Sequence, residues 1–113
     1  MNIFSVPARL LLFLPLQQML FAGIIEEPFF RGFLWGALRK AGWKDPWIWL
    51  TQAGLFWLAH FYYLGKAPWS TWLIVPAGGL VLGWLAWRSC SIASSILAHG
   101  CYNGFGQIVM FYI

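Results

Sequence analysis

Two adjacent glutamates, Glu26 and Glu27, are the residues of this sequence that are hardest to explain as simple packing. They lie inside a long apolar stretch and make up two of the three acidic residues in the chain. In the middle of a bilayer, each acid would cost about 2.5 to 3.5 kcal/mol. A carboxylate held away from water is also a candidate general base, because poor hydration makes it more basic. The pair therefore needs a partner, a function or both.

Arg31 provides a partner for only one of the two acids. On a helix, Glu27 and Arg31 are four residues apart and share a face, so they can form an ion pair. Glu26 points about 100° away from that face and stays free. This asymmetry predicts that Glu27 and Arg31 hold the structure while Glu26 faces a cavity. The alternative is that all three form one buried ion-pair cluster with a purely architectural role.

Both histidines of the chain, His60 and His99, also lie in apolar segments, and Asn103 follows His99 four residues later on the same helical face. A lone histidine in such a place is usually a satisfied core residue. Here two histidines occur together with an acid pair, an arginine and an asparagine, in a chain that has few other such groups. The residues that we expect to converge on one cavity are Glu26, His60, His99 and Asn103.

The composition places the elements that hold these residues in a membrane. Of the 113 residues, 61% are hydrophobic and only 9% are charged, and the mean hydropathy is +0.70. A soluble domain of this size could not bury so much apolar surface. The nine tryptophans gather near the ends of the apolar runs, as indoles do at headgroup level. The seven basic residues punctuate those runs, which argues against a nucleic-acid-binding face despite the net charge of +4.

Four apolar segments separated by short loops predict an all-α, polytopic transmembrane helical bundle with about four membrane helices. The expected helical regions are 3–38, 47–64, 69–87 and 91 to the C-terminus. Asp45 is the expected N-cap of the second region, with Pro46 at its first position, and Ser91 is the expected N-cap of the fourth. The last three regions have about 18 to 23 residues, enough to cross a hydrocarbon core of about 30 Å. We interpret 1–113 as a single membrane-embedded domain.

The expected depths of the polar residues in the bilayer are compatible with one site. If the loops 39–46 and 88–91 share one side, Glu26 and His60 each lie about 20 Å from that side. His99 lies about 12 Å deep, roughly one and a half turns away before helix tilt is considered. Polar groups from three helices can therefore meet inside the bundle. The two loops hold four of the basic residues, so the positive-inside rule places them in the cytoplasm.

Glycines recur at four-residue spacing in three pairs: Gly32 with Gly36, Gly79 with Gly83, and Gly100 with Gly104. Such pairs let helix backbones approach closely in lipid, where van der Waals contact replaces the hydrophobic driving force. We expect all three pairs to be places of tight helix packing.

The polar residues, taken in order, resemble the motifs of a known family. Glu26-Glu27-x-x-x-Arg31, Phe56-x-x-x-His60 and His99-x-x-x-Asn103 are similar to the three motifs of the CAAX prenyl-protease and bacteriocin-processing (CPBP, ABI) family of intramembrane endopeptidases. The flanking residues Phe30-Arg31-Gly32, Gly79 to Gly83 and Ser91-Ile92 also look like the signature region of that family. The resemblance covers residues 23–107. Each motif alone is weak, whereas three in order on separate helices are specific.

The resemblance implies hydrolysis of a peptide bond in or near the membrane by water that a glutamate and a histidine activate. By position, Glu26 would be the general base and His60 would hold and polarise the water. His99 and Asn103 would donate to the oxyanion, where scarce water strengthens such bonds. Glu27 with Arg31 would position the site.

A metal-dependent version also fits the residue types, and the family has been described both ways. Glu26, His60 and His99 could bind zinc and leave a fourth position open for water. We favour the version without a metal or another cofactor, because Asn103 beside His99 resembles a donor pair more than a ligand with its supporting shell.

The resemblance also implies the surroundings of the protein. The substrate would be a membrane-anchored peptide or protein, and the chain would be an integral, multi-pass protein, most simply in the cell (plasma) membrane of a prokaryote. Relatives usually carry additional membrane helices before the acid pair, and here about 25 residues precede it. We therefore expect a minimal or truncated member, or one in which a partner subunit replaces the missing N-terminal helices.

Two other classes of function use the same residue types. A non-catalytic membrane scaffold or immunity-type protein would keep the polar cluster as architecture. A proton or ion pathway also uses intramembrane glutamate and histidine, but it requires polar groups along the full depth of the bundle. Between Asn103 and the C-terminus, only Gln107 could continue such a path. The clustering of polar residues therefore favours a closed reaction site.

Overall fold

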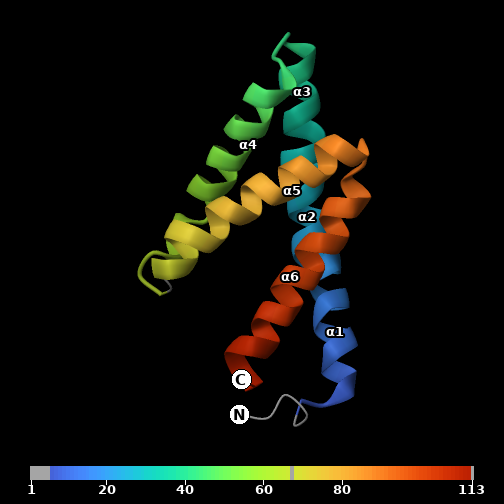
Figure 1. Ribbon diagram of the computed structural model, residues 1–113, viewed down its shortest axis with the longest axis vertical. Helices are drawn as coiled ribbons and strands as arrows, with labels where there is room; N and C mark the ends of the chain where they lie inside the picture. The colour runs from blue at the N-terminus through green and yellow to red at the C-terminus, as the bar shows by residue number, and fades with distance from the viewer. Residues whose placement is uncertain (1–5, 67, 113) are drawn as a thin grey trace.

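Helices make up every regular element in the part of the chain that the computed structural model describes, residues 6–66 and 68–112 (Figure 1). In chain order the elements are α1 (Ala8–Gln18), the π-helical η2 (Met19–Gly23), α2 (Ile24–Glu27), the π-helical η3 (Pro28–Leu34), α3 (Trp35–Lys40), α4 (Asp45–Ala59), the 3-10 turn η4 (Phe61–Tyr63), the π-helical η5 (Ser70–Ile74), α5 (Val75–Ser89) and α6 (Ile92–Tyr112). The predicted all-α class is confirmed. The expected start of the first helical region, at residues 3–5, lies outside the described residues.

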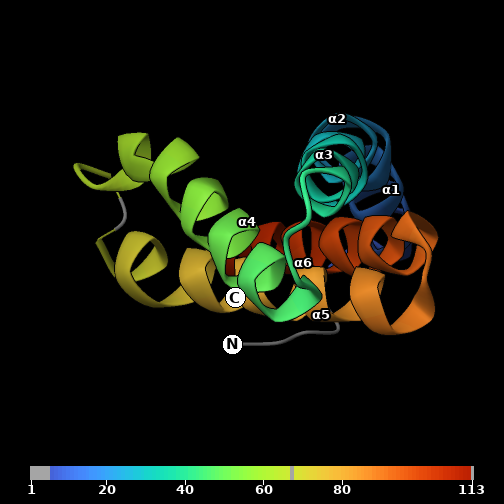
Figure 2. The same ribbon diagram turned by 90° about the horizontal axis from the view of Figure 1, so that it is seen from above.

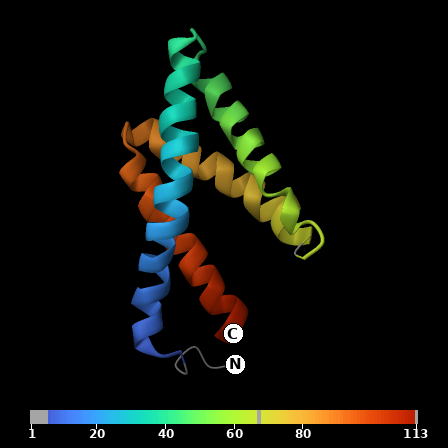
Figure 3. The ribbon, with the colours of Figure 1, turned by 180° about the vertical axis from the view of Figure 1, so that it is seen from behind.

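The first five elements form one continuous helix, Ala8–Lys40, which runs as a single column in Figure 3. Two wide π-helical stretches interrupt its α-helical geometry, and Pro28 opens the second of them. A proline inside a helix lacks an N–H and crowds the preceding turn, so a local change of winding accommodates it. Glu26 and Glu27 occupy the short α2 turn between the two stretches. Such bulges are frequent at functional sites.

The ends of α4 differ from the sequence prediction. Its first helical residue is Asp45, with Lys44 in the N-cap position, so the expected Asp45 cap is wrong by one residue. The helix ends at Ala59, five residues before the predicted end, and His60 lies in the irregular geometry that follows. Ser91 is confirmed as a cap, because its Oγ accepts a hydrogen bond from the Ala93 N–H at 3.1 Å.

Close backbone approach joins the helices at two of the three glycine pairs. The α1–η2 region packs along α6, where a Cβ added to Gly100 or Gly104 would overlap Met19 or Pro15. Figures 1 and 2 show α1 and α6 side by side, and α4 lying over α5. A Cβ on Gly79 would lie 3.3 Å from Ala53 Cα of α4. A Cβ on Gly83 would overlap the side chain of Gln52, also in α4.

The third glycine pair is not a packing site in this structure. An added Cβ at Gly32 or Gly36 would meet nothing within 4 Å, so the prediction of tight packing there is wrong. These glycines lie on the outer side of the first helix, where no other described element reaches them.

The outer surface of the bundle is strongly apolar. Large hydrophobic side chains are widely exposed, among them Leu12 (71%), Phe33 (71%) and Trp69 (80%). Two helices in the described residues, Ala8–Lys40 and Ser70–Ser89, are long and apolar enough to cross a membrane by length and composition. An apolar exterior of this extent is what a lipid environment requires.

Candidate active site

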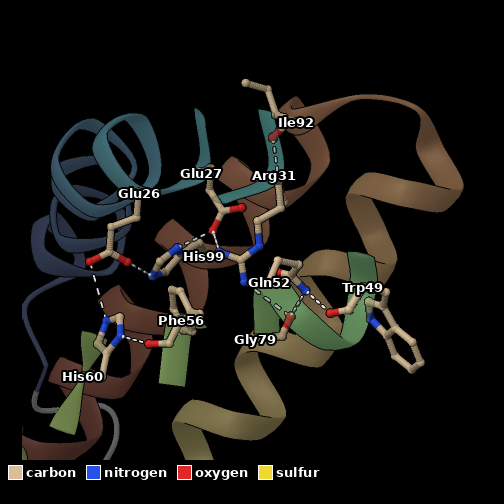
Figure 4. A network of polar contacts seen from close by, with 11 residues as sticks. Glu26, Glu27, Arg31, Trp49, Gln52, Phe56, His60, Gly79, Ile92 and His99 are labelled. Carbon is tan, nitrogen blue, oxygen red and sulfur yellow. Dashed lines mark hydrogen bonds and ion pairs between the residues drawn. The ribbon is translucent and has the colours of Figure 1, made fainter. Parts of the chain in front are cut away.

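The two neighbouring carboxylates of α2 have different surroundings (Figure 4). Arg31 Nη1 donates to Glu27 Oε1 at 3.1 Å, and both side chains are fully buried. Arg31 Nη2 reaches the carbonyl oxygen of Gly79 in α5, 3.4 Å away. The ion pair that the spacing predicts is therefore present, and it joins the first helix to α5.

Glu26 lies between the two histidines, as Figure 4 shows. Its Oε1 is 3.6 Å from His60 Nε2, and its Oε2 is 3.5 Å from His99 Nε2. Its side chain is 29% exposed, whereas that of Glu27 is completely covered. Side chains from α2, the end of α4 and α6 thus meet at one carboxylate that water and a substrate can reach.

His99 connects the two acids. Its Nδ1 lies 2.7 Å from Glu27 Oε1, while its Nε2 faces Glu26. Residue counting placed His99 more than a turn away from the level of Glu26. The side chains nevertheless meet because α6 approaches the first helix closely at Gly23, where an added Cβ would lie 3.0 Å from Ile96 Cγ2 and 3.2 Å from the Ile96 carbonyl oxygen.

The end of α4 orients His60. The His60 backbone N–H donates to the Trp57 carbonyl in a tighter turn, which leaves the Phe56 carbonyl without that helical donor. His60 Nδ1 lies 2.6 Å from the Phe56 carbonyl oxygen. A carbonyl only accepts, so Nδ1 carries the proton and Nε2 is the nitrogen that faces Glu26. The early end of α4 is therefore part of the site.

Two residues of the surrounding shell had no assigned role in the sequence analysis. The Phe56 ring covers Arg31, with 4.4 Å from the guanidinium carbon to the ring centroid, and it meets His99 edge-on at 5.9 Å. Gln52 is fully buried and donates to the carbonyl oxygens of Trp49 and Gly79 at 2.8 and 3.1 Å. A spacing of four residues from Gln52 to Phe56 to His60 could have revealed a shared helical face.

Asn103 is not gathered with the other three candidates. Its Nδ2 donates to Gln18 Oε1 of α1 at 3.4 Å, one turn beyond His99 on α6. The structure thus brings together Glu26, His60 and His99, and it directs Asn103 to α1. Gln18 is the partner that the sequence analysis missed, since no local spacing relates two residues so far apart.

The donor types of the site suit zinc, but their arrangement is a separate question. Among the described residues, no group of three or more His, Cys, Asp or Glu side chains is arranged so that it could hold a metal ion. The mechanism below is derived from the side chains of Glu26, His60 and His99.

An all-α bundle with an apolar exterior, whose interior holds an acid pair and two histidines, is the arrangement of a membrane-embedded protein with a candidate functional site. A family model described as type II CAAX prenyl endopeptidase Rce1-like matches residues 8–105. The chain therefore belongs to this Rce1-like family of CAAX-type intramembrane proteases, which confirms the resemblance seen in its motifs. Comparisons with curated proteins and with solved structures gave no match.

Proposed function

We propose that this protein is an endopeptidase that hydrolyses a peptide bond of a membrane-anchored peptide or protein with a water molecule that Glu26 and His60 activate. The observation that carries the proposal is the position of the Glu26 carboxylate, 3.6 and 3.5 Å from the Nε2 atoms of His60 and His99. Family membership supports the reaction class.

The hydrogen bond at His60 supports a shared water. His60 Nδ1 donates a hydrogen bond to the Phe56 carbonyl. In this tautomer, neutral His60 presents a lone pair at Nε2. The facing Glu26 carboxylate is also an acceptor, so a proton donor between them satisfies both groups. Water is such a donor, and the exposed edge of Glu26 lets it enter. Glu26 then takes a proton as the water oxygen bonds to the scissile carbonyl carbon, and it gives that proton to the amine nitrogen that leaves as the C–N bond breaks.

His99 is placed to donate to the oxyanion that this attack creates. Glu27 accepts from His99 Nδ1 at 2.7 Å, and a second proton on Nε2 makes the imidazolium that can donate toward the reaction centre. The two carboxylates, the Arg31 guanidinium and this imidazolium then balance in formal charge, which a buried cluster requires. Glu27 and Arg31 are positioning residues in this scheme.

Asn103 is proposed as a second oxyanion donor. Its bond to Gln18 is long, at 3.4 Å, and therefore weak enough to exchange for a bond to a developing negative charge.

The protein that carries out this reaction would be multi-pass and, by the same proposal, would lie in the plasma membrane of a prokaryote. No cofactor has a part in these steps.

The test is cleavage of candidate membrane-anchored peptides in co-expression with the chain, followed by mass spectrometry. Glu26→Gln keeps the shape of the side chain and removes the basic oxygen, so we expect a loss of about 100-fold or more in rate. Undiminished cleavage by this variant would overturn the assignment of Glu26 as base.

A chelator arm and a flux arm complete the design. Unchanged cleavage by purified protein after chelation supports the metal-free reaction, whereas a loss that zinc restores would replace it with the zinc version. Ion flux without any peptide product would indicate a transport pathway. No cleavage of any peptide, with partner binding unchanged in Glu26→Gln, would indicate a scaffold.

A further inference from the structure

A pocket of about 170 Å³ lies where the end of the first helix passes the turn between α5 and α6. Its walls include Arg31, Trp35, Arg39, Trp87, Ser91 and Ile92. None of the two glutamates or two histidines of the candidate active site lines it. The pocket therefore shares Arg31 with the candidate active site and none of the residues proposed to take part in the chemistry.

The walls of this pocket are basic. Two arginines line it, and none of its lining residues is acidic. Arg31 is fully buried, and its Nε has no hydrogen-bond partner among the described residues. Arg39 uses Nε and Nη2 to bond Asp45, so that pair does not use its third nitrogen, Nη1. Each guanidinium has a carboxylate partner that does not line the pocket, Glu27 for Arg31 and Asp45 for Arg39, and the exposed Arg39 keeps Nη1 outside its ion pair.

The start of α6 adds a further positive end. This helix is 21 residues long, its first turn holds no acidic residue, and its first residue, Ile92, lines the pocket. Unpaired N–H groups and the helix dipole at such a terminus favour negative charge. The Ser91 hydroxyl caps the N–H of Ala93, and it also lies at the pocket.

The position of the pocket indicates which anion would fill it. The rings of Trp35 and Trp87 flank it with their centroids 6.1 Å apart, and tryptophans favour the headgroup level of a bilayer. Figure 1 shows the α3–α4 and α5–α6 turns in the same half of the molecule. Further basic residues, Lys40 and Arg88, lie in the last helical turns of α3 and α5. Anionic lipid phosphates gather at such basic interfacial surfaces.

We propose that this pocket binds the phosphate group of an anionic phospholipid headgroup. The phosphate oxygens accept from Arg39 and from the first N–H groups of α6, while the buried charge of Arg31 stabilises them from the wall. A free phosphate ion has the same chemistry, so the experiment distinguishes the two sources. Lipid binding needs no substrate, and it is measured independently of cleavage.

The test uses the purified full chain in a neutral detergent, with short-chain phosphatidylglycerol, short-chain phosphatidylcholine and inorganic phosphate as separate probes. Bound lipid is counted by native mass spectrometry, and Tm is measured against the concentration of each probe. We expect phosphatidylglycerol to bind and to raise Tm more than phosphatidylcholine. A shift by inorganic phosphate alone that equals the lipid shift would overturn the lipid source, and equal binding of the two lipids would overturn the anion site.

Two pairs of variants locate the binding. Arg39→Gln should bind phosphatidylglycerol about fivefold more weakly, the effect of about 1 kcal/mol for one basic residue at an anionic surface. Lys40→Gln removes the same charge from a residue that does not line the pocket, and it should bind like the parent. Equal losses in both variants would show a diffuse surface attraction and would contradict the pocket.

The second pair acts at the α6 N-terminus without removing an arginine. Ser91→Asp and Ser91→Asn both keep a good N-cap, but only the aspartate places a negative charge at the pocket. Ser91→Asp should weaken binding by at least as much as Arg39→Gln, and Ser91→Asn should not. Asp45→Asn is a further control, because it breaks the Arg39 ion pair and keeps the arginine, so binding should be retained. If Asp45→Asn loses binding as Arg39→Gln does, the ion pair and not the arginine charge is responsible.

Discussion

Two acid–arginine pairs involve the first helix, and they lie in opposite environments, one buried and one exposed. Glu27 and Arg31 pair at 3.1 Å with both side chains completely buried. Arg39 and Asp45 pair at 2.7 Å at the helix end, with side chains 59% and 31% exposed. The second pair is shorter, yet water and salt screen it, so an exposed pair contributes little to stability.

The buried pair is surrounded by groups that the exposed pair does not need. His99 Nδ1, the Gly79 carbonyl and the Phe56 ring all meet the Glu27–Arg31 pair. Removing two charges from water is expensive unless further bonds satisfy them. Burial thus turns one ion pair into a network, and this network places His99 beside Glu26. The role of an ion pair therefore depends more on its surroundings than on the distance between its charges.

The largest expected effect comes from breaking the buried pair. Glu27→Ala or Arg31→Ala leaves one uncompensated buried charge and should destabilise the fold by about 3 to 5 kcal/mol, with a loss of folded yield. Thermal melting in detergent and the yield of monodisperse protein measure this. The double replacement of Glu27 and Arg31 by apolar residues should cost less than the sum of the single changes. If both single variants accumulate and melt like the parent, the positioning role is wrong.

Replacing Glu26 should reduce the cleavage rate much more than the stability of the fold, unlike replacing Glu27. Glu26→Gln should insert and should lose less stability than Glu27→Ala, because the Glu26 side chain is 29% exposed and Arg31 pairs with Glu27 instead. A loss of about 100-fold in cleavage rate corresponds to about 2.7 kcal/mol in the barrier. A variant that is inactive only because it fails to fold would remove this distinction between the two glutamates.

Phe56 tests whether an aromatic ring over the Arg31 guanidinium stabilises the buried ion pair. Phe56→Leu keeps the backbone carbonyl that holds His60 and removes the ring over Arg31, so we expect a loss of about 1 to 2 kcal/mol of stability. Phe33→Leu is the matched control, because the Phe33 ring is 71% exposed on the same first helix. Equal melting temperatures for the two variants would mean that the ring does not stabilise the guanidinium.

The smallest effect should come from the exposed pair. The hydrogen bonds from Arg39 and Trp35 hold the pKa of Asp45 below its usual range. A lowered folded-state pKa means that this contribution is present above the unfolded pKa, near 3.9, and is lost as the pH falls through the folded value. Asp45→Asn should therefore cost about 0.2 to 1 kcal/mol at neutral pH and at low salt. Melting curves of parent and variant should differ at pH 7 and converge only as the pH falls well below 4, and a difference that persists there would contradict the assignment.

The sequence alone determined the features that depend on neighbours along the chain. An i, i+4 spacing is enough to pair Glu27 with Arg31, and a serine before an apolar run is enough to cap α6, because helix geometry fixes these distances. The all-α class and the order of the helices follow from apolar periodicity in the same way. The set of polar residues in apolar segments could also be read directly.

Only the tertiary structure decided which of these polar residues meet. His99 reaches Glu27 and Asn103 reaches Gln18, contacts that span 72 and 85 residues of sequence. The end of α4 at Ala59 also followed no local signal, although it frees the carbonyl that orients His60. Contacts of this kind depend on how far each helix is rotated and tilted against its neighbour, and close approach at glycines such as Gly23 sets that geometry. Residue spacing within one helix carries no information about it, which is why the expected packing at Gly32 was wrong.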